Sequence, residues 1–187
     1  MCGRCRLIGV SPEHFLSAPE EKNRYLTHNN SIGQQGYVDF LNRAILPSLK
    51  YLRQSMLGLD YGCGYAPTLS VLLANRGFRC ENYDPCFIEN PLNKKYDYLF
   101  STEVFEHFFH PGREMARITA LLKPGGLLIV MTERWSDLRQ FRTWYYTRDP
   151  AHVAFYHRKT FDYICDAFGF FELFDDGRSV LLLRKND

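Results

Sequence analysis

Short apolar runs and amphipathic segments alternate along most of the chain. Apolar positions spaced three and four residues apart predict helices, whereas runs without polar positions predict strands buried on both faces. The expected helices span residues 35–46, 69–76, 114–122 and 160–168, and the expected strands span 56–60, 78–83, 98–101, 127–131, 170–174 and 179–184. We expect the first helix to end at Pro47, and Gly77 to cap the second.

This alternation predicts an α/β domain with a doubly wound, mostly parallel sheet of Rossmann-like type. The last two strands flank the turn signal at 175–178, so the sheet is expected to finish in an antiparallel hairpin. The polar region before the first strand contains the helix at 35–46 and scattered aromatic residues. We therefore expect a single domain over residues 1–187, with an N-terminal helical lid over 1–50 and the core over 51–187.

Composition narrows the function classes by exclusion. The 23 Lys and Arg residues nearly balance the 21 Asp and Glu residues, so the basic surplus of a nucleic-acid binder is missing. No apolar run approaches the ~18–20 residues of a membrane helix, and the first residues lack the apolar stretch of a signal peptide. We expect a cytoplasmic protein with a small-molecule substrate and neither a membrane nor a nucleic acid as partner. The oligomeric state is left open.

A glycine-rich turn follows the first strand. Gly62 and Gly64 allow a sharp turn, and the next helix offers unpaired N–H groups to a ligand. A dinucleotide fingerprint needs a third glycine three residues later, where this chain has Pro67. Asp60, just before the turn, would repel a pyrophosphate and suits a cationic ligand. The charge favours S-adenosylmethionine, which carries a sulfonium and an ammonium group.

A second acidic residue ends the next strand. Asp84 lies 22 residues after Gly62, close to the position from which a carboxylate accepts both ribose hydroxyls. A glycine pair followed by an acid also arises by chance, as a turn beside a solvated aspartate. Other segments of the chain are therefore needed to distinguish a cofactor site from a glycine turn beside a solvated aspartate.

Several segments resemble the class I S-adenosylmethionine-dependent methyltransferases. They are D-Y-G-C-G at 60–64, Y-D-P at 83–85, Y-D-Y-L-F-S-T-E-V-F-E-H at 96–107 and L-L-K-P-G-G-L-L-I-V at 121–130. A narrower resemblance, to small bacterial members with a cysteine-containing N-terminal extension, rests on residues 24–30, 36–41 and 144–156. The resemblance implies methyl transfer with S-adenosylmethionine as cofactor.

The resemblance also implies which residues hold the cofactor. Contributions would come from residues of the lid, from the glycine turn, from the acid that binds the ribose and from the end of the strand expected at 98–101. The residues expected on this basis are Tyr25, His28, Asn29, Asp60, Gly62, Gly64, Asp84, Ser101, Thr102 and Glu103.

Three residues are candidates for a catalytic base, which is needed only where the acceptor must lose a proton. They are His107, His152 and Tyr156; His110 is also considered, but it precedes Pro111 and is interpreted as a loop residue. His107 could instead hydrogen-bond its own loop, and the aromatic segment around His152 could be core packing rather than a pocket wall. Glu106 is interpreted as an acid at a helix start, where it favours the dipole.

Cys2 and Cys5 supply only half of a zinc site, because four ligands are the norm. We therefore expect no metal and a frayed N-terminus. Two other functions stay open. The domain could bind the cofactor without catalysis, or it could be a nicotinamide-dependent oxidoreductase, against which Asp60 and Pro67 both count.

The 12 residues between Asp84 and Asp97 are few for this fold. One parallel crossover alone needs about a dozen residues or more. In the full version of this fold a third strand lies between these two residues. We expect that strand to be missing here, or reduced to a stub over 86–88, which leaves the adenine side of the site open. Phe87 or Asn90 would then supply the adenine contacts.

Overall fold

The computed structural model describes residues 1–27 and 31–187. Its helices are α1 (Ala18–Leu26), α2 (Gln35–Ser48), α3 (Thr68–Ala74), α4 (Pro111–Leu121), α5 (Leu138–Phe141) and α6 (Arg158–Phe168). Its strands are β1 (Ile8–Gly9), β2 (Leu57–Tyr61), β3 (Arg79–Tyr83), β4 (Tyr96–Thr102), β5 (Leu122–Met131), β6 (Arg134–Trp135), β7 (Ala154–His157), β8 (Phe170–Asp175) and β9 (Val180–Lys185). Short 3-10 helices are η1 (Pro12–His14), η2 (Leu49–Tyr51), η3 (Phe105–His107) and η4 (Tyr145–Arg148). None of the described helices combines the length and apolar character needed to cross a membrane.

The main sheet has six strands in the order β3-β2-β4-β5-β9-β8. The strands from β3 to β5 pair in parallel, whereas β9 is antiparallel to both β5 and β8. This confirms the α/β class, the mostly parallel sheet and the C-terminal antiparallel hairpin. Between β3 and β4 the chain forms only an isolated bridge, which joins Asp84 to Ile88. The strand that the full fold would place between β3 and β4 is therefore missing, as the short spacing predicted.

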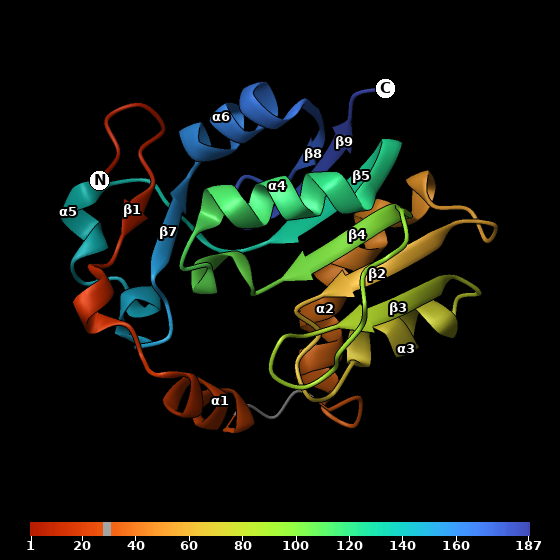
Figure 1. Ribbon diagram of the computed structural model, residues 1–187, viewed down its shortest axis with the longest axis horizontal. Helices are drawn as coiled ribbons and strands as arrows, with labels where there is room; N and C mark the ends of the chain where they lie inside the picture. Colours follow the sequence, from red (N-terminus) through yellow and green to blue (C-terminus); the bar gives the residue numbers. More distant parts are fainter. Residues whose placement is uncertain (28–30) are drawn as a thin grey trace.

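Helices cover both faces of this sheet (Figure 1). On one face, α4 and α6 pack against the strands through Met115, Ile118 and Phe161. On the other face, α2 and α3 contribute Leu41, Ile45 and other apolar residues to a second cluster. With both faces buried, β4 and β5 need apolar residues throughout, which explains their continuous apolar runs. The helix α1 lies apart from these layers, below the edge where the parallel strands end (Figure 1).

A second, three-stranded sheet was not predicted. It has the order β1-β7-β6, and it includes the N-terminus because β1 pairs antiparallel with β7. Cys5 is buried, and its carbonyl oxygen accepts a hydrogen bond of 2.9 Å from Thr160 Oγ1. The expectation of a frayed N-terminus was therefore wrong, since backbone pairing and side-chain burial hold this segment in place.

Two local expectations also need correction. The helix α2 continues through Pro47 and ends one residue later, because a proline in the last turn removes only one hydrogen bond. The strand expected at 127–131 begins earlier, at Leu122, and so includes residues 123–126, where the pairing with β4 jumps from Leu122 to Leu127. Gly125 has a φ of 67° there, so these residues form an irregularity within the strand rather than a separate turn.

Candidate active site

A cavity of about 590 Å³ opens where the parallel strands β2, β3 and β4 end. The loops that follow these strands form its floor, α1 and α2 form one wall, and η3 with the start of α4 forms the other. Carboxylates outnumber guanidinium groups in the lining, which contains Glu21, Asp60, Asp84, Glu103, Glu106 and Glu114 against Arg113 and Arg117. An acidic cavity at the carboxyl edge of a parallel sheet suits a cationic small molecule.

The glycine turn forms one end of the floor. Gly62 has a φ of 87° and Gly64 a φ of 67°, in the region that L-residues rarely adopt. A Cβ at Gly62 would lie 2.4 Å from a methyl carbon of Val104, so a side chain cannot fit there. The turn is anchored to the next strand, because the Gly62 amide donates a 2.8 Å hydrogen bond to the carbonyl oxygen of Tyr83.

Asp84 is held in a fixed orientation beside this turn. Its Oδ2 accepts a 2.9 Å hydrogen bond from the Gly64 amide, and its Oδ1 accepts a 2.8 Å bond from the Cys86 amide. Each carboxylate oxygen has two lone pairs, so both oxygens can accept a further hydrogen bond from a ligand. This geometry can receive a pair of neighbouring hydroxyls.

Asp60 is the most deeply buried acid of the floor, with 2% of its surface exposed. Its Oδ1 has no hydrogen-bond partner among the described residues. Burial, and next the negative charge of Asp84, raise the pKa of Asp60 to about 7. A buried carboxyl with one oxygen unpaired, beside a second acid, lacks a positive charge. A cationic ligand such as S-adenosylmethionine fits this need.

The end of β4 turns abruptly at Glu103. This residue has a φ of 54°, which is unusual for a residue with a side chain and often marks a functional site. Glu103 and Thr102 line the cavity. Ser101 does not line it, and its side chain is fully buried within β4. Burial, followed by the charge of Glu106, raises the pKa of Glu103.

The helix α1 closes the cavity from the side opposite the strands. Tyr25 lines the cavity, and its ring centroid lies 5.2 Å from that of His107. Arg24 binds Asp149 through two hydrogen bonds, of 3.2 Å from Nε and 2.6 Å from a terminal nitrogen, which tie α1 to the loop before β7. The other expected lid residues, His28 and Asn29, lie outside the described residues.

The three expected base candidates separate into two groups. His107 and His152 both line the cavity, with ring centroids 4.9 Å apart. Tyr156 lies in the core with 1% of its surface exposed, and its hydroxyl donates a 3.1 Å hydrogen bond to the carbonyl oxygen of Phe105. The placement of Tyr156 at the site was wrong, because the strand β7 turns this side chain toward α6 and away from the cavity.

Comparison with protein families identifies the domain. Residues 31–171 match the family model described as a methyltransferase domain, which is three quarters of the chain. The chain belongs to this methyltransferase family. No curated protein sequence matches it.

Solved structures share the fold of this methyltransferase at low sequence identity. A putative methyltransferase from Haloferax volcanii, in complex with the Trm112 activator, is 13% identical, with a TM-score of 0.68 over 90% of this chain and 98% of that one. Magnesium protoporphyrin IX methyltransferase from Synechocystis, with bound S-adenosylhomocysteine, is 16% identical, with a TM-score of 0.61 over 93% and 97%. An S-adenosylmethionine-dependent methyltransferase from Archaeoglobus fulgidus is 15% identical, with a TM-score of 0.61 over 86% and 99%. The predicted enzyme class and cofactor, an S-adenosylmethionine-dependent methyltransferase, are confirmed.

Two features of the methyltransferase cavity were missed or left undecided by sequence reasoning. Glu106 was interpreted as an acid at a helix start, yet it is fully buried and lines the cavity. The pair of acids three residues apart before His107 was the available signal. On the adenine side, Phe87 lines the cavity and lies 6.0 Å from the ring of Tyr65. Asn90 instead donates to the carbonyl oxygen of Asn82 and accepts from the Leu92 amide.

Proposed function

We propose that this methyltransferase transfers a methyl group by in-line displacement to a small-molecule acceptor bound between η3 and α1. The observation that carries the proposal is the single cavity that joins the glycine turn and Asp60 to His107 and His152. Its volume of about 590 Å³ lies within the ~300–1,000 Å³ range of small-ligand sites.

In this proposal the floor of the cavity holds the cofactor. Asp84 accepts the ribose hydroxyls, and Asp60 with Glu103 faces the positively charged methionine end. The aromatic pair Phe87 and Tyr65 takes the adenine, since both rings line the cavity close to Asp84. When bound, S-adenosylmethionine supplies a methyl group already activated by the sulfonium.

The protein then mainly has to align the acceptor and exclude water. Tyr25 on α1 covers the cavity, and its ring packs edge-on against His107. His107 on η3 and His152 in the loop before β7 line the cavity, and the acceptor's reacting atom would face them. Burial lowers the pKa of His152, so its ring is neutral near pH 7 and carries a lone pair that can face the acceptor end of the cavity.

A thermal-shift and calorimetry panel tests this proposal. S-adenosylmethionine and S-adenosylhomocysteine should bind one-to-one and stabilise the protein, whereas NAD and NADP should not. Incubation with S-adenosylmethionine and a cellular metabolite extract should release S-adenosylhomocysteine. If the protein binds the cofactor but releases no S-adenosylhomocysteine with any of a broad set of extracts, it is a binding module without catalysis. If NAD alone stabilises it, the proposal is replaced by an oxidoreductase.

A further inference from the structure

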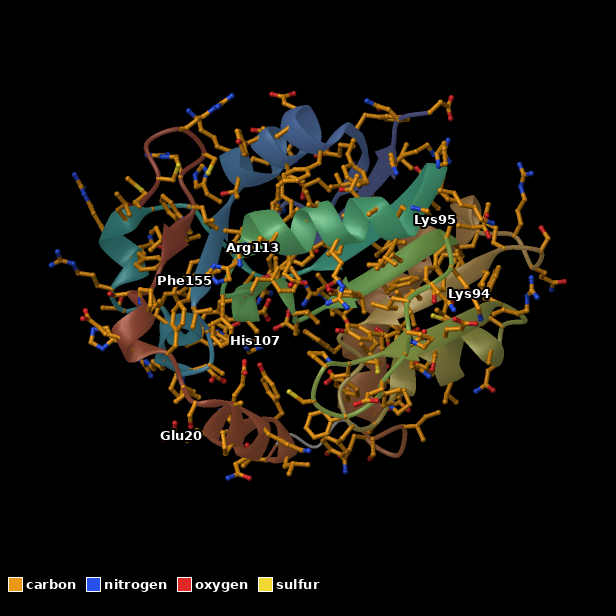
Figure 2. The ribbon with its side chains drawn as sticks, viewed as in Figure 1. Glu20, Lys94, Lys95, His107, Arg113 and Phe155 are labelled. Carbon is orange, nitrogen blue, oxygen red and sulfur yellow. The ribbon has the colours of Figure 1, made fainter. Side chains whose placement is uncertain are left out.

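Three side chains at the acceptor end of the cavity bring potential metal-ligand atoms close together. Glu106, His107 and His152 each offer one nitrogen or oxygen atom, and these atoms all lie within 4.8 Å of one another. Two of the residues belong to η3, and the third comes from the loop before β7. Figure 2 shows His107 beside the space between the sheet and α1. We call this set the Glu106 cluster.

The carboxylate of Glu106 is only half satisfied. The side chain is fully buried, and its Oε2 accepts a 2.8 Å hydrogen bond from Thr132 Oγ1. Its Oε1 has no hydrogen-bond partner among the described residues. A buried carboxylate oxygen without a partner is costly, so its retention points to a ligand that completes it.

Backbone carbonyls orient both imidazole rings of the cluster. His107 Nδ1 lies 2.9 Å from the carbonyl oxygen of Ala151, and His152 Nδ1 lies 2.7 Å from that of Tyr146. A carbonyl oxygen only accepts, so both protons are on Nδ1 and the ring lone pairs are on Nε2. Histidines that bind metals typically donate their other ring nitrogen in this way.

We propose that Glu106, His107 and His152 bind a divalent first-row transition cation, to which an oxygen of the methyl acceptor adds as a further ligand. Two imidazoles and one carboxylate are a donor set for such ions and leave coordination positions open. Ligand atoms about 2.0–2.2 Å from an ion lie at most ~4.4 Å apart, so small side-chain movements close the site.

This inference rests on the proposed function, because it places the cation at the acceptor end of that cavity. It also narrows the acceptor to molecules with a hydroxyl or a similar oxygen. An acceptor O–H bound to a divalent cation releases its proton to solvent more readily, which leaves the oxygen as a nucleophile. The cluster then needs no separate base, and it replaces the initial expectation that the protein binds no metal.

Cobalt provides a direct test, because Co²⁺ takes the place of such ions and its visible absorption reports the ligands. Tag-free protein is stripped with EDTA and titrated with Co²⁺ by calorimetry and absorption spectroscopy, with S-adenosylhomocysteine titrated separately. The variants are Glu106→Gln, which keeps the shape of the side chain, and His152→Gln. The matched control is His14→Gln, since His14 lies on η1 with 70% of its side chain exposed.

The wild type should bind one Co²⁺, and each cluster variant should weaken this affinity at least tenfold. His14→Gln should bind as the wild type does, and all folded variants should retain affinity for S-adenosylhomocysteine. If the thermal melt of Glu106→Gln shows no folded baseline, the Co²⁺ affinity of His152→Gln decides whether the metal site exists. No Co²⁺ binding, or equal binding by both cluster variants, would overturn the metal site.

The N-terminal thiols are the competing site for the ion. Binding through them would give a thiolate-to-cobalt charge-transfer band that disappears in Cys2→Ser, and this result would also overturn the assignment. Failure of the metal site is distinguishable from failure of the proposed function. The first leaves S-adenosylhomocysteine binding intact, whereas loss of that binding in the wild type rejects the proposed function itself.

Discussion

At the residue scale, two carboxylates with different environments define the floor of the cavity. Asp84 receives two backbone amides and is thereby fixed as an acceptor. Asp60 receives no hydrogen bond at Oδ1 from the described residues, and burial raises its pKa to about 7. The same side-chain chemistry therefore serves two purposes, one as a permanent hydrogen-bond acceptor and one as a charge that depends on pH.

Asp84→Asn should weaken binding of S-adenosylhomocysteine by at least about tenfold, because hydrogen bonds to a charged acceptor contribute ~1.5–3 kcal/mol. Calorimetry measures the change. Glu89→Gln, an exposed acid five residues further along the chain, serves as the matched control and should bind normally. Equal affinity of Asp84→Asn and the wild type would remove Asp84 from the site.

Affinity for S-adenosylmethionine should rise with pH through the titration of Asp60. With a pKa of about 7, this carboxyl ionises as the pH rises through neutrality, and only the ionised form attracts a cation. A single linked proton predicts about tenfold tighter binding at about pH 8 than at about pH 6. Asp60→Asn should flatten this profile, and a flat wild-type profile would contradict the prediction.

The same raised pKa acts on stability in the opposite direction. Without a ligand, ionisation of a buried carboxyl costs free energy, so the contribution of Asp60 is most favourable below the usual pKa of an aspartate. It is lost as the pH rises through about 7. Binding of a cation at Asp60 should therefore raise the melting temperature more at alkaline than at acid pH.

At the scale of elements, α1 is held by few contacts in spite of its position over the cavity. The capping box of Ser17 and Glu20 defines its start, and Tyr25 packs on His107 near its end. Arg24 and Asp149 join it to the loop that carries His152. Within the part of the chain that the structure describes, the rest of the fold positions this helix through the Arg24–Asp149 ion pair, the contacts of Tyr25 with His107 and Phe87, and Lys22 over the Phe87 ring.

Arg24→Met should loosen this closure without unfolding the domain. The pair is partly exposed, so its loss should cost no more than about 1 kcal/mol of stability. The Kd for S-adenosylhomocysteine should nevertheless rise by a few fold, because α1 then spends less time closed. Calorimetry and thermal melts measure the two effects, and Asn23→Ala, an exposed position of the same helix, should change neither.

The elements that could be predicted are those whose burial produces a local pattern of apolar residues. The strands β2, β4 and β5 and the helices α2, α4 and α6 present apolar runs or stripes. Each was expected close to its observed bounds, except that β5 begins five residues earlier than expected. The strands β1, β6 and β7 have at most four residues and exist only through pairing with distant segments. No local pattern indicates such strands, so the second sheet could not be predicted.

The site divides in the same way. Asp60 and Asp84 could be placed together from sequence, because they end neighbouring parallel strands. The burial of Glu106 could not, since it depends on Thr132 and on a loop more than forty residues further along the chain. The position of Tyr156 failed for a similar reason, as the direction of its side chain is set by the pairing of β7.

At the scale of the whole molecule, two sheets meet through the α4 and α6 side of the core. The N-terminal segment belongs to the smaller sheet, where Arg6 lies 5.4 Å from the ring of Trp135 and Ile8 packs on its apolar cluster. The smaller sheet therefore joins the first residues of the sequence to residues 154–157, and the N-terminal segment is part of the fold rather than an appendage.

Deletion of residues 1–10 should destabilise the domain without affecting cofactor binding. The deletion removes β1 and the buried Cys5, so we expect a loss of about 2 kcal/mol, or a fall in Tm of about 4–8 °C. Thermal melts and calorimetry with S-adenosylhomocysteine check both parts. An unchanged Tm would mean that the pairing of β1 contributes nothing to stability.

The missing third strand leaves the sheet ending at β3, and the loop after Asp84 covers this edge with only an isolated bridge. An enzyme with such an unwalled edge should tolerate enlarged nucleobases. With adenine bound as proposed, a bulky substituent on its amino group would lie beside Phe87 at this end of the sheet. We therefore expect this methyltransferase to accept such analogues as methyl donors.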